Sequence, residues 1–272
     1  MPAMADADLT QRTIADFGEQ WTNFRSNEGY YASIDMLRDH LGPLLDIGDL
    51  YGKVVADIGS GTGRIVRMLA AAGAAKIHAF EPSACFDVLK ENVADLGERV
   101  ACHRVRGDQI NEKAEFDFVL SFGVVHHIPE PEPVVRAAFS ALKPGGRIVL
   151  WLYGKEGNEL YLRLILPLRR LTMHLSHKRL LALSRFLNVV VGAYARAAIR
   201  LHLPLRDYLK GVFTRFPSET RVLVIYDQLN PAYAKYYTAD DARALVENAG
   251  FSDVALYHRH GYSWTVVGSR PH

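Results

Sequence analysis

Between residues 54 and 152 the chain alternates short apolar runs with longer segments in which apolar residues recur every three or four positions. A short apolar run bounded by turn residues is typical of a buried strand, whereas the longer repeat indicates an amphipathic helix. Strands that alternate with helices predict a parallel sheet joined by right-handed crossovers. We therefore expect an α/β fold with a doubly wound, mostly parallel sheet.

The same pattern places the individual elements. Strands are predicted at residues 54–58, 76–80, 100–105, 116–122 and 147–152. Helices are predicted from residue 64 onward, at 85–96 and at 134–142, followed by a turn at 143–146. The pattern returns near the end as a helix at 239–249 and strands at 251–257 and 262–267. Such a terminal antiparallel pair is compatible with an otherwise parallel sheet.

The segment before the first strand is rich in aromatic residues. Residues 1–12 are expected to form a frayed tail, and a second amphipathic helix is expected at 34–45. Between them, Phe17, Trp21 and Phe24 recur at helical spacing. This face either packs in the core or folds over a ligand as a lid, which would bring Tyr30 or Tyr31 near the reacting centre.

A chain of 272 residues fits one domain with an insertion. We divide it into an N-terminal helical lid (1–46), a core (47–152), a basic helical insertion or cap (153–235) and a C-terminal completion of the core (236–272). The net charge of +2 gives no indication of a nucleic-acid partner.

Charge is nevertheless concentrated in the insertion. Residues 155–221 contain thirteen Lys or Arg against four Asp or Glu, a net +9, so the rest of the chain carries −7. Three interpretations stay open: arginines that bind an anionic acceptor, an interfacial surface that reaches a lipid-like substrate, or a solvated helical bundle or homodimer face. The pairs Arg169-Arg170 and Lys178-Arg179 are the first candidates for mutation.

The remaining composition bears on location. Cys85 and Cys102 have no metal-ligand spacing, so we expect small buried hydrophobic residues in a reducing compartment and no metal site. The first residues lack the pattern of a signal peptide, and no stretch of about 18 uncharged apolar residues predicts a membrane span. We expect a cytoplasmic protein.

The most informative stretch is the glycine loop after the first strand. Gly59, Gly61 and Gly63 alternate with other residues immediately before a helix. Glycines permit positive φ and let a ligand approach the backbone, and the helix N-terminus directs free N–H groups at it. This combination is typical of a site for a nucleotide-like cofactor with an anionic part.

Two acidic residues follow neighbouring strands and fit the same ligand. Glu81 stands where a carboxylate can accept hydrogen bonds from two ribose hydroxyls, and Asp108 is placed to accept from an adenine amino group. Both are expected at the carboxyl ends of strands, where open α/β sheets bind ligands. Glu81 alone would suit NAD equally well, but a dinucleotide site has the spacing G-x-G-x-x-G rather than G-x-G-x-G.

Five stretches carry a family resemblance. In chain order they are Asp57-Ile58-Gly59-Ser60-Gly61-Thr62-Gly63, Glu81-Pro82, Gly107-Asp108, Phe116-Asp117-Phe118-Val119 and Leu142-Lys143-Pro144-Gly145-Gly146. In order and spacing they resemble the motifs of class I S-adenosylmethionine-dependent methyltransferases, strongly over 50–152 and in outline over 236–268. The resemblance implies a seven-stranded Rossmann-like sheet with a reversed last hairpin, S-adenosylmethionine as methyl donor and S-adenosylhomocysteine as product.

The resemblance also implies roles for individual residues. Asp57 and the glycine loop would approach the methionine moiety, Glu81 would hold the ribose, Asp108 would bind adenine, and Ser121 with Phe122 would line the floor under the sulfonium. The predicted cofactor-binding residues are Asp57, Gly59, Ser60, Gly61, Thr62, Gly63, Glu81, Pro82, Gly107, Asp108, Gln109, Ser121 and Phe122.

The run at 122–128 is similar to the small-molecule branch of this family, which includes ubiquinone and menaquinone methyltransferases. The Asn/Asp-Pro-Pro-aromatic motif of many nucleic-acid amino-methyltransferases is absent from the sequence, so no nucleic-acid partner is expected. His126 and His127 follow the fourth strand, and either is a candidate general base, although one could simply fix the loop by hydrogen bonds.

Acceptor residues are less clearly marked. The substrate-binding candidates are Tyr30, Tyr31, Tyr226, Arg169, Arg170 and His258. Asp227, Tyr236, Tyr237 and His260 are further candidates.

Three functional hypotheses remain. The first is a methyltransferase acting by in-line displacement on a small, anionic or partly apolar acceptor, with His126 as its base. The second is a scaffold or regulator that binds S-adenosylmethionine or S-adenosylhomocysteine without turnover. The third is a methyltransferase that acts on a lipid-like acceptor while in peripheral contact with a membrane.

Overall fold

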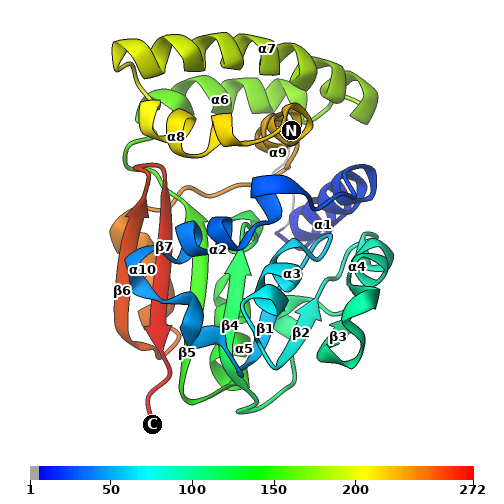
Figure 1. Ribbon diagram of the computed structural model, residues 1–272, viewed down its shortest axis with the longest axis vertical. Helices are drawn as coiled ribbons and strands as arrows, with labels where there is room; N and C mark the ends of the chain where they lie inside the picture. The colour runs from blue at the N-terminus through cyan, green and yellow to red at the C-terminus, as the bar shows by residue number, and fades with distance from the viewer. Residues whose placement is uncertain (1–5) are drawn as a thin grey trace.

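The computed structural model describes residues 6–272 and is built around a seven-stranded sheet of order β3-β2-β1-β4-β5-β7-β6 (Figure 1). The strands are β1 (Val54–Ile58), β2 (Lys76–Phe80), β3 (Val100–His103), β4 (Phe116–Phe122), β5 (Leu142–Tyr153), β6 (Ser252–Arg259) and β7 (Ser263–Ser269). The first five pair in parallel, and β7 runs antiparallel between β5 and β6. The predicted mostly parallel sheet with a reversed last hairpin is confirmed.

Helices cover both faces of this sheet (Figure 1). They are α2 (Ile34–Leu41), α3 (Arg64–Ala71) and α4 (Phe86–Val93) on one face, and α5 (Glu132–Ala141) and α10 (Ala239–Glu247) on the other. Neighbouring residues of β4 point to opposite faces of the sheet. Leu120 packs in the core on the side of α2, α3 and α4, and Val119 packs in the core on the side of α5 and α10. Because both faces are buried, this central strand has a continuous apolar sequence.

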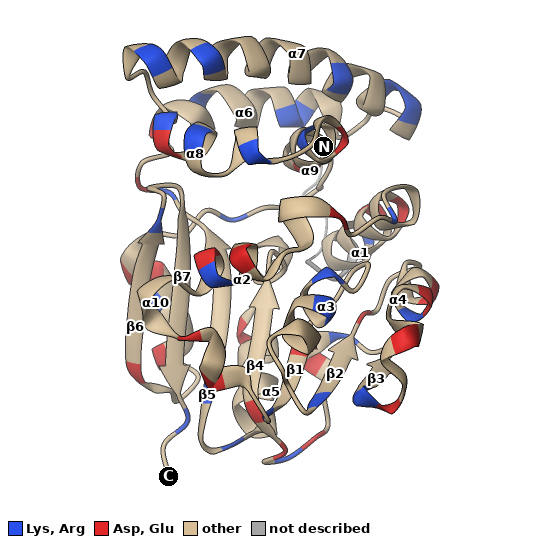
Figure 2. Ribbon diagram, in the orientation of Figure 1, with Lys and Arg blue, Asp and Glu red and all other residues tan. Residues whose placement is uncertain are grey.

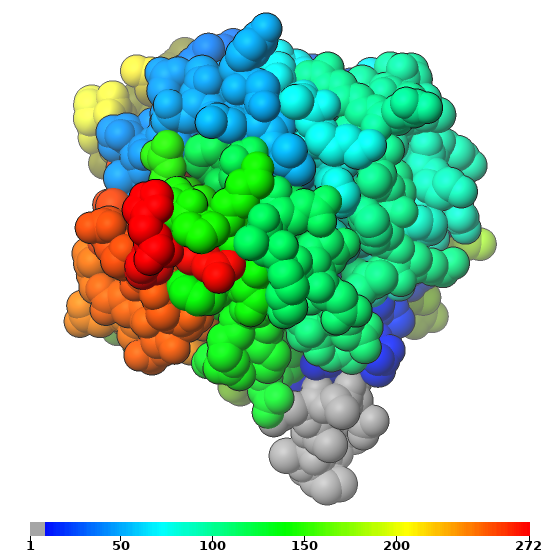
Figure 3. Space-filling model, turned by 90° about the horizontal axis from the view of Figure 1, so that it is seen from below, coloured from blue at the N-terminus to red at the C-terminus, as the bar shows by residue number. Residues whose placement is uncertain are grey.

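The predicted turn at 143–146 belongs to β5 instead. Its register with β4 shifts between Phe116 and Phe118, and Gly145, at φ +76°, donates its N–H to Arg270 O at 2.8 Å. The turn glycines therefore form an irregular strand segment that pairs with the end of the chain. Figure 3 shows the C-terminal residues in red against this green segment.

A layer of four helices lies beyond the end of the sheet at which the parallel strands finish (Figure 1). It consists of α6 (Glu159–Thr172), α7 (His177–Leu201), α8 (Arg206–Gly211) and α9 (Ser218–Leu229). In this layer α7 packs on α8 and α9. Figure 2 shows that lysines and arginines predominate here, whereas acidic side chains are spread over the rest of the fold.

The N-terminal segment is more ordered than expected. Helix α1 (Asp6–Asn23) covers most of the predicted frayed tail, so that prediction is wrong for residues 6–12. Arg12 Nη2 donates to Met173 O at 3.3 Å, which connects α1 to the end of α6. Contact with the helical layer stabilises a segment whose own sequence is a weak helix signal. Residues 1–5 of that prediction lie outside the described residues.

Candidate active site

A cavity of about 760 Å³ lies between the carboxyl ends of the parallel strands and the helical layer. Its wall includes the loop after β1, the ends of β2 and β4, part of α1, and apolar side chains of α6, α7 and α9. This is the end of an open α/β sheet at which ligands bind. Leu164 of α6 belongs to this wall and is 69% exposed.

The glycine loop forms one wall. Gly59, Gly61 and Gly63 all have positive φ, at +75°, +53° and +85°. A Cβ atom on Gly59 would lie 2.4 Å from Val124 Cγ2, so only glycine fits there. Gly63 is the N-cap of α3, whose first N–H groups lack helical partners. The N–H groups of Gly59, Ser60, Gly61 and Gly63 bond within the protein, so the donors available to a ligand are those of the first turn of α3.

The N-terminal segment lies over this loop. Thr62 Oγ1 donates to Asn27 Oδ1 at 2.7 Å, and Asn27 Nδ2 donates back to Thr62 O at 2.9 Å. The indole of Trp21 lies 3.6 Å from the position of a Cβ atom on Gly61. Trp21 and Tyr31 both line the cavity. The N-terminal segment therefore contacts the glycine loop directly, and its role as a lid stays a prediction.

Glu81 is buried at the end of β2 and faces the cavity. Its Oε2 accepts the Gly61 N–H and its Oε1 accepts the Ser83 N–H, each at 2.8 Å. A carboxylate oxygen has capacity for a second hydrogen bond. The side chain is therefore held in one orientation and can still accept from two adjacent hydroxyls.

Asp57 lies behind the loop and outside the cavity lining. It is buried, its Oδ2 has no hydrogen-bond partner among the described residues, and burial raises its pKa to about 7. An unpartnered buried carboxylate is costly for the protein without a ligand. From behind the loop it can act on a ligand in the cavity only through the loop backbone.

Asp108 lines the cavity beyond Glu81 and pairs with Arg106 through two hydrogen bonds, at 3.0 and 2.6 Å. Of the thirteen predicted cofactor residues, those that line the cavity are Gly59, Ser60, Gly61, Thr62, Glu81, Pro82, Gly107, Asp108 and Phe122. The residues of that prediction outside the lining are Asp57, Gly63, Gln109 and Ser121.

His126 does not reach the cavity. It is fully buried, its ring stacks on Tyr153 with centroids 3.8 Å apart, and neither ring nitrogen makes a hydrogen bond of ordinary geometry within the described residues. Burial holds its pKa well below the usual range. The prediction of His126 as base therefore needs correction, because the protein separates its ring from an acceptor in the cavity.

His127 lines the cavity beside Phe17. Its Nδ1 lies 2.8 Å from Tyr233 O. Because a carbonyl oxygen can only accept, we assign the proton to Nδ1, which leaves the lone pair on Nε2. Burial lowers the pKa of His127 to about 4, against the opposing effect of Asp227. At neutral pH the ring is an uncharged proton acceptor, so His127 replaces His126 as the candidate base.

A polar network on the side towards the insertion joins the predicted candidate Asp227 to Tyr153, Tyr161 and Gln228, which the sequence did not indicate. Tyr153 O–H donates to Asp227 Oδ2 at 2.8 Å and accepts from Gln228 Nε2 at 2.7 Å. Tyr161 O–H donates to Gln228 Oε1 at 2.9 Å, and all four side chains line the cavity. Burial and the Asp227 carboxylate raise the pKa of Tyr153 well above its usual range, so the phenol stays protonated.

His40 of α2 was also missed. It lines the cavity, stacks on Phe122 with centroids 5.3 Å apart, and has Nδ1 2.7 Å from Met36 O. Burial keeps its pKa well below the usual range. The only sequence signal was a histidine on the apolar face of the predicted helix at 34–45.

The structure separates most of the predicted substrate residues. Tyr31 lines the cavity, but Tyr30 packs on Phe216 and Arg215 outside its lining. Tyr226 is buried behind the wall, with its hydroxyl 2.9 Å from His177 Nδ1. Of the three predicted substrate-binding tyrosines, Tyr31 lines the cavity, and Tyr30 and Tyr226 do not.

The remaining candidates also lie outside the cavity lining. Arg169 is buried and donates to Gln228 O at 2.7 Å and to Tyr236 O–H at 2.8 Å, so it positions cavity residues and is not placed to bind an acceptor. Arg170 is exposed, and His258 stacks on Trp264 with centroids 4.2 Å apart. Among the further candidates, Asp227 and Tyr236 line the cavity, Tyr237 is buried away from it, and His260 pairs with Asp39.

Comparisons with known proteins indicate the family of this chain. A family model described as a methyltransferase domain matches residues 56–148. A ubiquinone biosynthesis O-methyltransferase of Escherichia coli O81 is 30% identical over 183 residues, covering 58% of this chain and 71% of the relative. A protein of the same name from Escherichia coli O127:H6 is 28% identical over 141 residues, covering 43% of this chain. Over that match the chain spans about half, 54%, of the relative.

A solved structure shows the same fold. The 1,6-didemethyltoxoflavin-N1-methyltransferase of Burkholderia thailandensis, with bound 1,6-didemethyltoxoflavin and S-adenosylhomocysteine, has a TM-score of 0.57 at 14% identity and covers 100% of this chain and 93% of its own. The relatives identify the family. The chain belongs to the class I S-adenosylmethionine-dependent methyltransferases, in their small-molecule branch.

Proposed function

We propose that this protein transfers the methyl group of S-adenosylmethionine to a hydroxyl oxygen of a largely apolar small molecule. The observation that carries the proposal is a single cavity running from the glycine loop to apolar side chains of the insertion, such as Leu168, Leu187 and Val191. A hydroxyl acceptor is supported by the relatives, which are named as O-methyltransferases.

The residues at the loop end fit S-adenosylmethionine. The positive-φ glycines leave room for a ligand against the backbone, the Glu81 oxygens have capacity for ribose hydroxyls, and Asp108 lies beyond Glu81 for the adenine. Asp57 lies outside the lining and would act on the cofactor only through the loop in front of it. When bound, S-adenosylmethionine supplies an activated methyl group and leaves as S-adenosylhomocysteine.

The remaining chemistry belongs to the protein. An in-line displacement needs the acceptor oxygen held in line and water kept out, which the lid and the apolar wall would do. A hydroxyl acceptor must also lose its proton as the methyl–oxygen bond forms. We assign that proton to Nε2 of His127, since this nitrogen carries the lone pair next to the cavity.

An anionic acceptor fits less well. Among the described residues, the cavity lining contains Arg64 and Arg106 but no lysine or arginine of the insertion. Arg106 is paired with Asp108, and Arg64 donates to Tyr31 O at 3.1 Å. The basic residues of the insertion therefore have another role than holding the acceptor.

That role, in our proposal, is contact with an anionic bilayer. By length and composition, helix α7 is long and apolar enough to cross a membrane. Its most apolar stretch of 18 residues has a mean hydropathy of 1.3, and 22% of that stretch is buried. Its exposed side includes Phe186 and Val189, at 65% and 69%, next to exposed leucines of α6. Since α7 packs on α8 and α9, peripheral contact explains this face better than a span.

Basic side chains accompany these apolar residues. We call the exposed large apolar and exposed basic residues of the two helices the α6–α7 surface. It comprises Leu160, Leu164, Leu166, Leu171, Phe186, Val189, Val190, Tyr194 and Leu201 with Arg163, Arg170, Lys178, Arg179, Arg185, Arg196 and Arg200. Leu164 belongs both to this surface and to the cavity wall. A lipid-like acceptor could therefore enter the cavity from a bilayer without crossing water.

The proposed function is tested by binding and then turnover. Calorimetry should detect one site per chain, which binds either S-adenosylmethionine or S-adenosylhomocysteine. A screen of hydroxylated apolar compounds should then yield methyl ethers. Cofactor binding with no acceptor methylated in a broad extract would instead support the scaffold hypothesis. Absence of cofactor binding would contradict both.

A further inference from the structure

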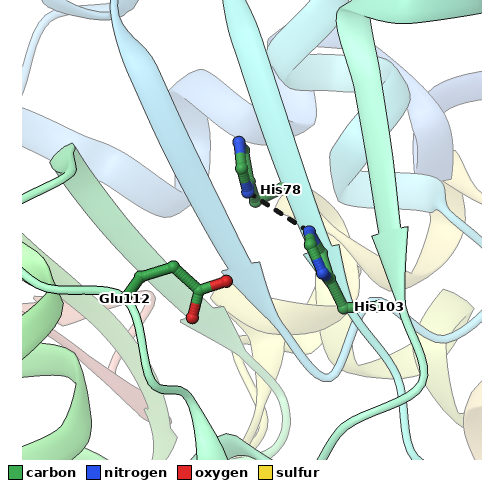
Figure 4. Close-up of side chains that lie close together, drawn as sticks. All are labelled: His78, His103 and Glu112. Carbon is green, nitrogen blue, oxygen red and sulfur yellow. Dashed lines mark hydrogen bonds between the residues drawn. The ribbon is translucent and has the colours of Figure 1, made fainter.

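A second cluster of chemically active side chains lies on the sheet away from the cavity. His78 of β2 is paired in register with Ala101, and His103 of β3 comes two residues later, so the two imidazoles share one face of the sheet. Glu112, in the segment that leads into β4, points its carboxylate towards them (Figure 4). None of the three belongs to the cavity lining.

The distances suit a metal ion. His103 Nε2 and His78 Nδ1 are 3.2 Å apart, and one ligand atom from each of the three residues lies within 4.8 Å of the others. A tetrahedral zinc ion with Zn–N bonds of about 2.0–2.1 Å holds two imidazole nitrogens about 3.3–3.4 Å apart. In the structure the two nitrogens share a hydrogen bond, drawn as a dashed line in Figure 4, so a zinc ion would replace the proton between them at nearly the same separation.

The opposite nitrogen of His78 provides an independent indication. His78 Nε2 lies 3.6 Å from Glu115 Oε1. A carboxylate beside the non-ligating nitrogen is the usual arrangement by which proteins orient a metal-bound histidine. On the other side the imidazoles pack against Phe80 and Phe116, which limits their movement.

We propose that His78, His103 and Glu112 bind one Zn²⁺ ion, with water at the fourth position and Glu115 orienting His78. The ion joins the edge strand β3 and the segment at 110–115 to β2. It also fixes the end of the strand pair next to the cofactor site, where Glu81 N–H donates to His103 O at 3.0 Å. This site is independent of the proposed methyl transfer and differs from the expectation of no metal, because ligands this far apart in sequence form no local motif.

The test uses the full chain without an affinity tag, after removal of metals with EDTA. Titration with ZnCl₂ should show one site per chain, and Co²⁺ should give the strong visible absorption of a tetrahedral centre. His103→Gln should weaken zinc binding by about a hundredfold or more, and Glu115→Gln by about tenfold. His174→Gln, at an exposed histidine outside the cluster, should leave binding unchanged.

Zinc should also raise the Tm of the wild type by several degrees, since a ligand that binds the folded state stabilises it. His103→Gln should abolish that rise. Equal zinc affinity in the wild type and in His103→Gln, or no binding at micromolar zinc, would overturn the proposal. If His103→Gln does not fold, Glu112→Gln in the surface segment decides the question in the same titration. Calorimetry with S-adenosylmethionine should be unaffected by Glu112→Gln.

Discussion

At the scale of single residues, the ring of His127 reaches the cavity whereas that of its neighbour His126 is enclosed by protein. The hydrogen bond from Nδ1 to Tyr233 O fixes the His127 ring and leaves Nε2 as the basic atom. His126 instead packs on Tyr153. His127 is therefore the candidate base, and His126 has a packing role.

We expect His127→Asn to lower kcat by about 10²–10⁴-fold, because it removes Nε2 while an amide can still donate to Tyr233 O. The affinity for S-adenosylmethionine should be unchanged in calorimetry. His126→Phe is the control, since it keeps a flat ring against Tyr153, and its kcat should stay within a few fold of the wild type. Equal losses in both variants would argue that neither histidine is the base.

The lowered pKa of His127 predicts how the free energy of unfolding depends on pH. In the unfolded chain the ring has a pKa of about 6.5, whereas in the folded protein it is about 4, so between these values the unfolded state binds more protons. Relative to His127→Asn, the wild type should lose about 3 kcal/mol of unfolding free energy as pH falls from about 6.5 to about 4. The comparison with the variant is needed because Asp57, whose pKa is raised to about 7, acts in the opposite direction.

Denaturant titrations at several pH values measure this difference. A difference in unfolding free energy that stays constant over the range would show that His127 is protonated as easily when folded as when unfolded.

The residues that could be predicted from the sequence belong to local motifs. Gly59, Gly61 and Glu81 follow strand ends directly, so their spacing alone indicates one ligand. Tyr153, Gln228 and His40 come from the end of a strand, a late helix and an early helix, and only the fold brings them to one cavity. Arg169 failed as an acceptor-binding prediction because the sequence does not show that protein oxygens already occupy its donors.

At the scale of elements, the glycine loop and the start of α3 form the part of the site that tolerates least change. Gly59 combines a φ of +75° with a Cβ position 2.4 Å from Val124. Gly52 has a similar φ of +71° but nothing within 4 Å. Substitutions at these two positions therefore distinguish the effect of backbone strain from that of a steric clash.

We expect Gly59→Ala to weaken S-adenosylmethionine binding by more than tenfold, because the methyl group displaces Val124 or the loop. Strain at positive φ adds about 1–3 kcal/mol of destabilisation. Gly52→Ala should lose a similar amount of unfolding free energy through strain, but its affinity for S-adenosylmethionine should be unchanged. Calorimetry and thermal melts of both variants make the comparison, and normal binding by Gly59→Ala would contradict the placement of the cofactor.

Elements were predicted best where one period dominates the sequence. The strands before residue 140 begin where expected because their apolar runs are bounded by turn residues. The segment at 143–146 was misread because its turn residues pair with Arg270 at the far end of the chain. The start of α1 was missed because its order depends on contacts with α6, more than 150 residues away.

At the scale of the whole molecule, charge and apolar exposure coincide at one end. The insertion carries a net +9 and the rest of the chain −7. The α6–α7 surface combines this charge with exposed leucine, valine and phenylalanine side chains. We therefore expect an anionic bilayer to orient the molecule, with the opening of its cavity towards the lipid.

We expect the wild type to sediment with phosphatidylglycerol vesicles and less with phosphatidylcholine vesicles. The double variant Phe186→Ser, Val189→Ser and the charge reversal of Lys178 and Arg179 to Glu should each reduce that binding at least about tenfold. Tyr51→Ser, at an exposed aromatic residue on the core, is the matched control and should bind as the wild type does. If both surface variants bind normally and keep their acceptor KM, the membrane proposal fails.

The central claim is that the cofactor and an apolar hydroxylated acceptor meet in one cavity. It is tested most directly by a single turnover with S-adenosylmethionine labelled in its methyl group, in the wild type and in Val191→Trp, which fills the acceptor end of the cavity. We expect label in a methyl ether with the wild type, and a loss of transfer in Val191→Trp with unchanged S-adenosylmethionine affinity. Transfer at the wild-type rate in Val191→Trp, or no labelled acceptor in either protein despite bound cofactor, would contradict the account.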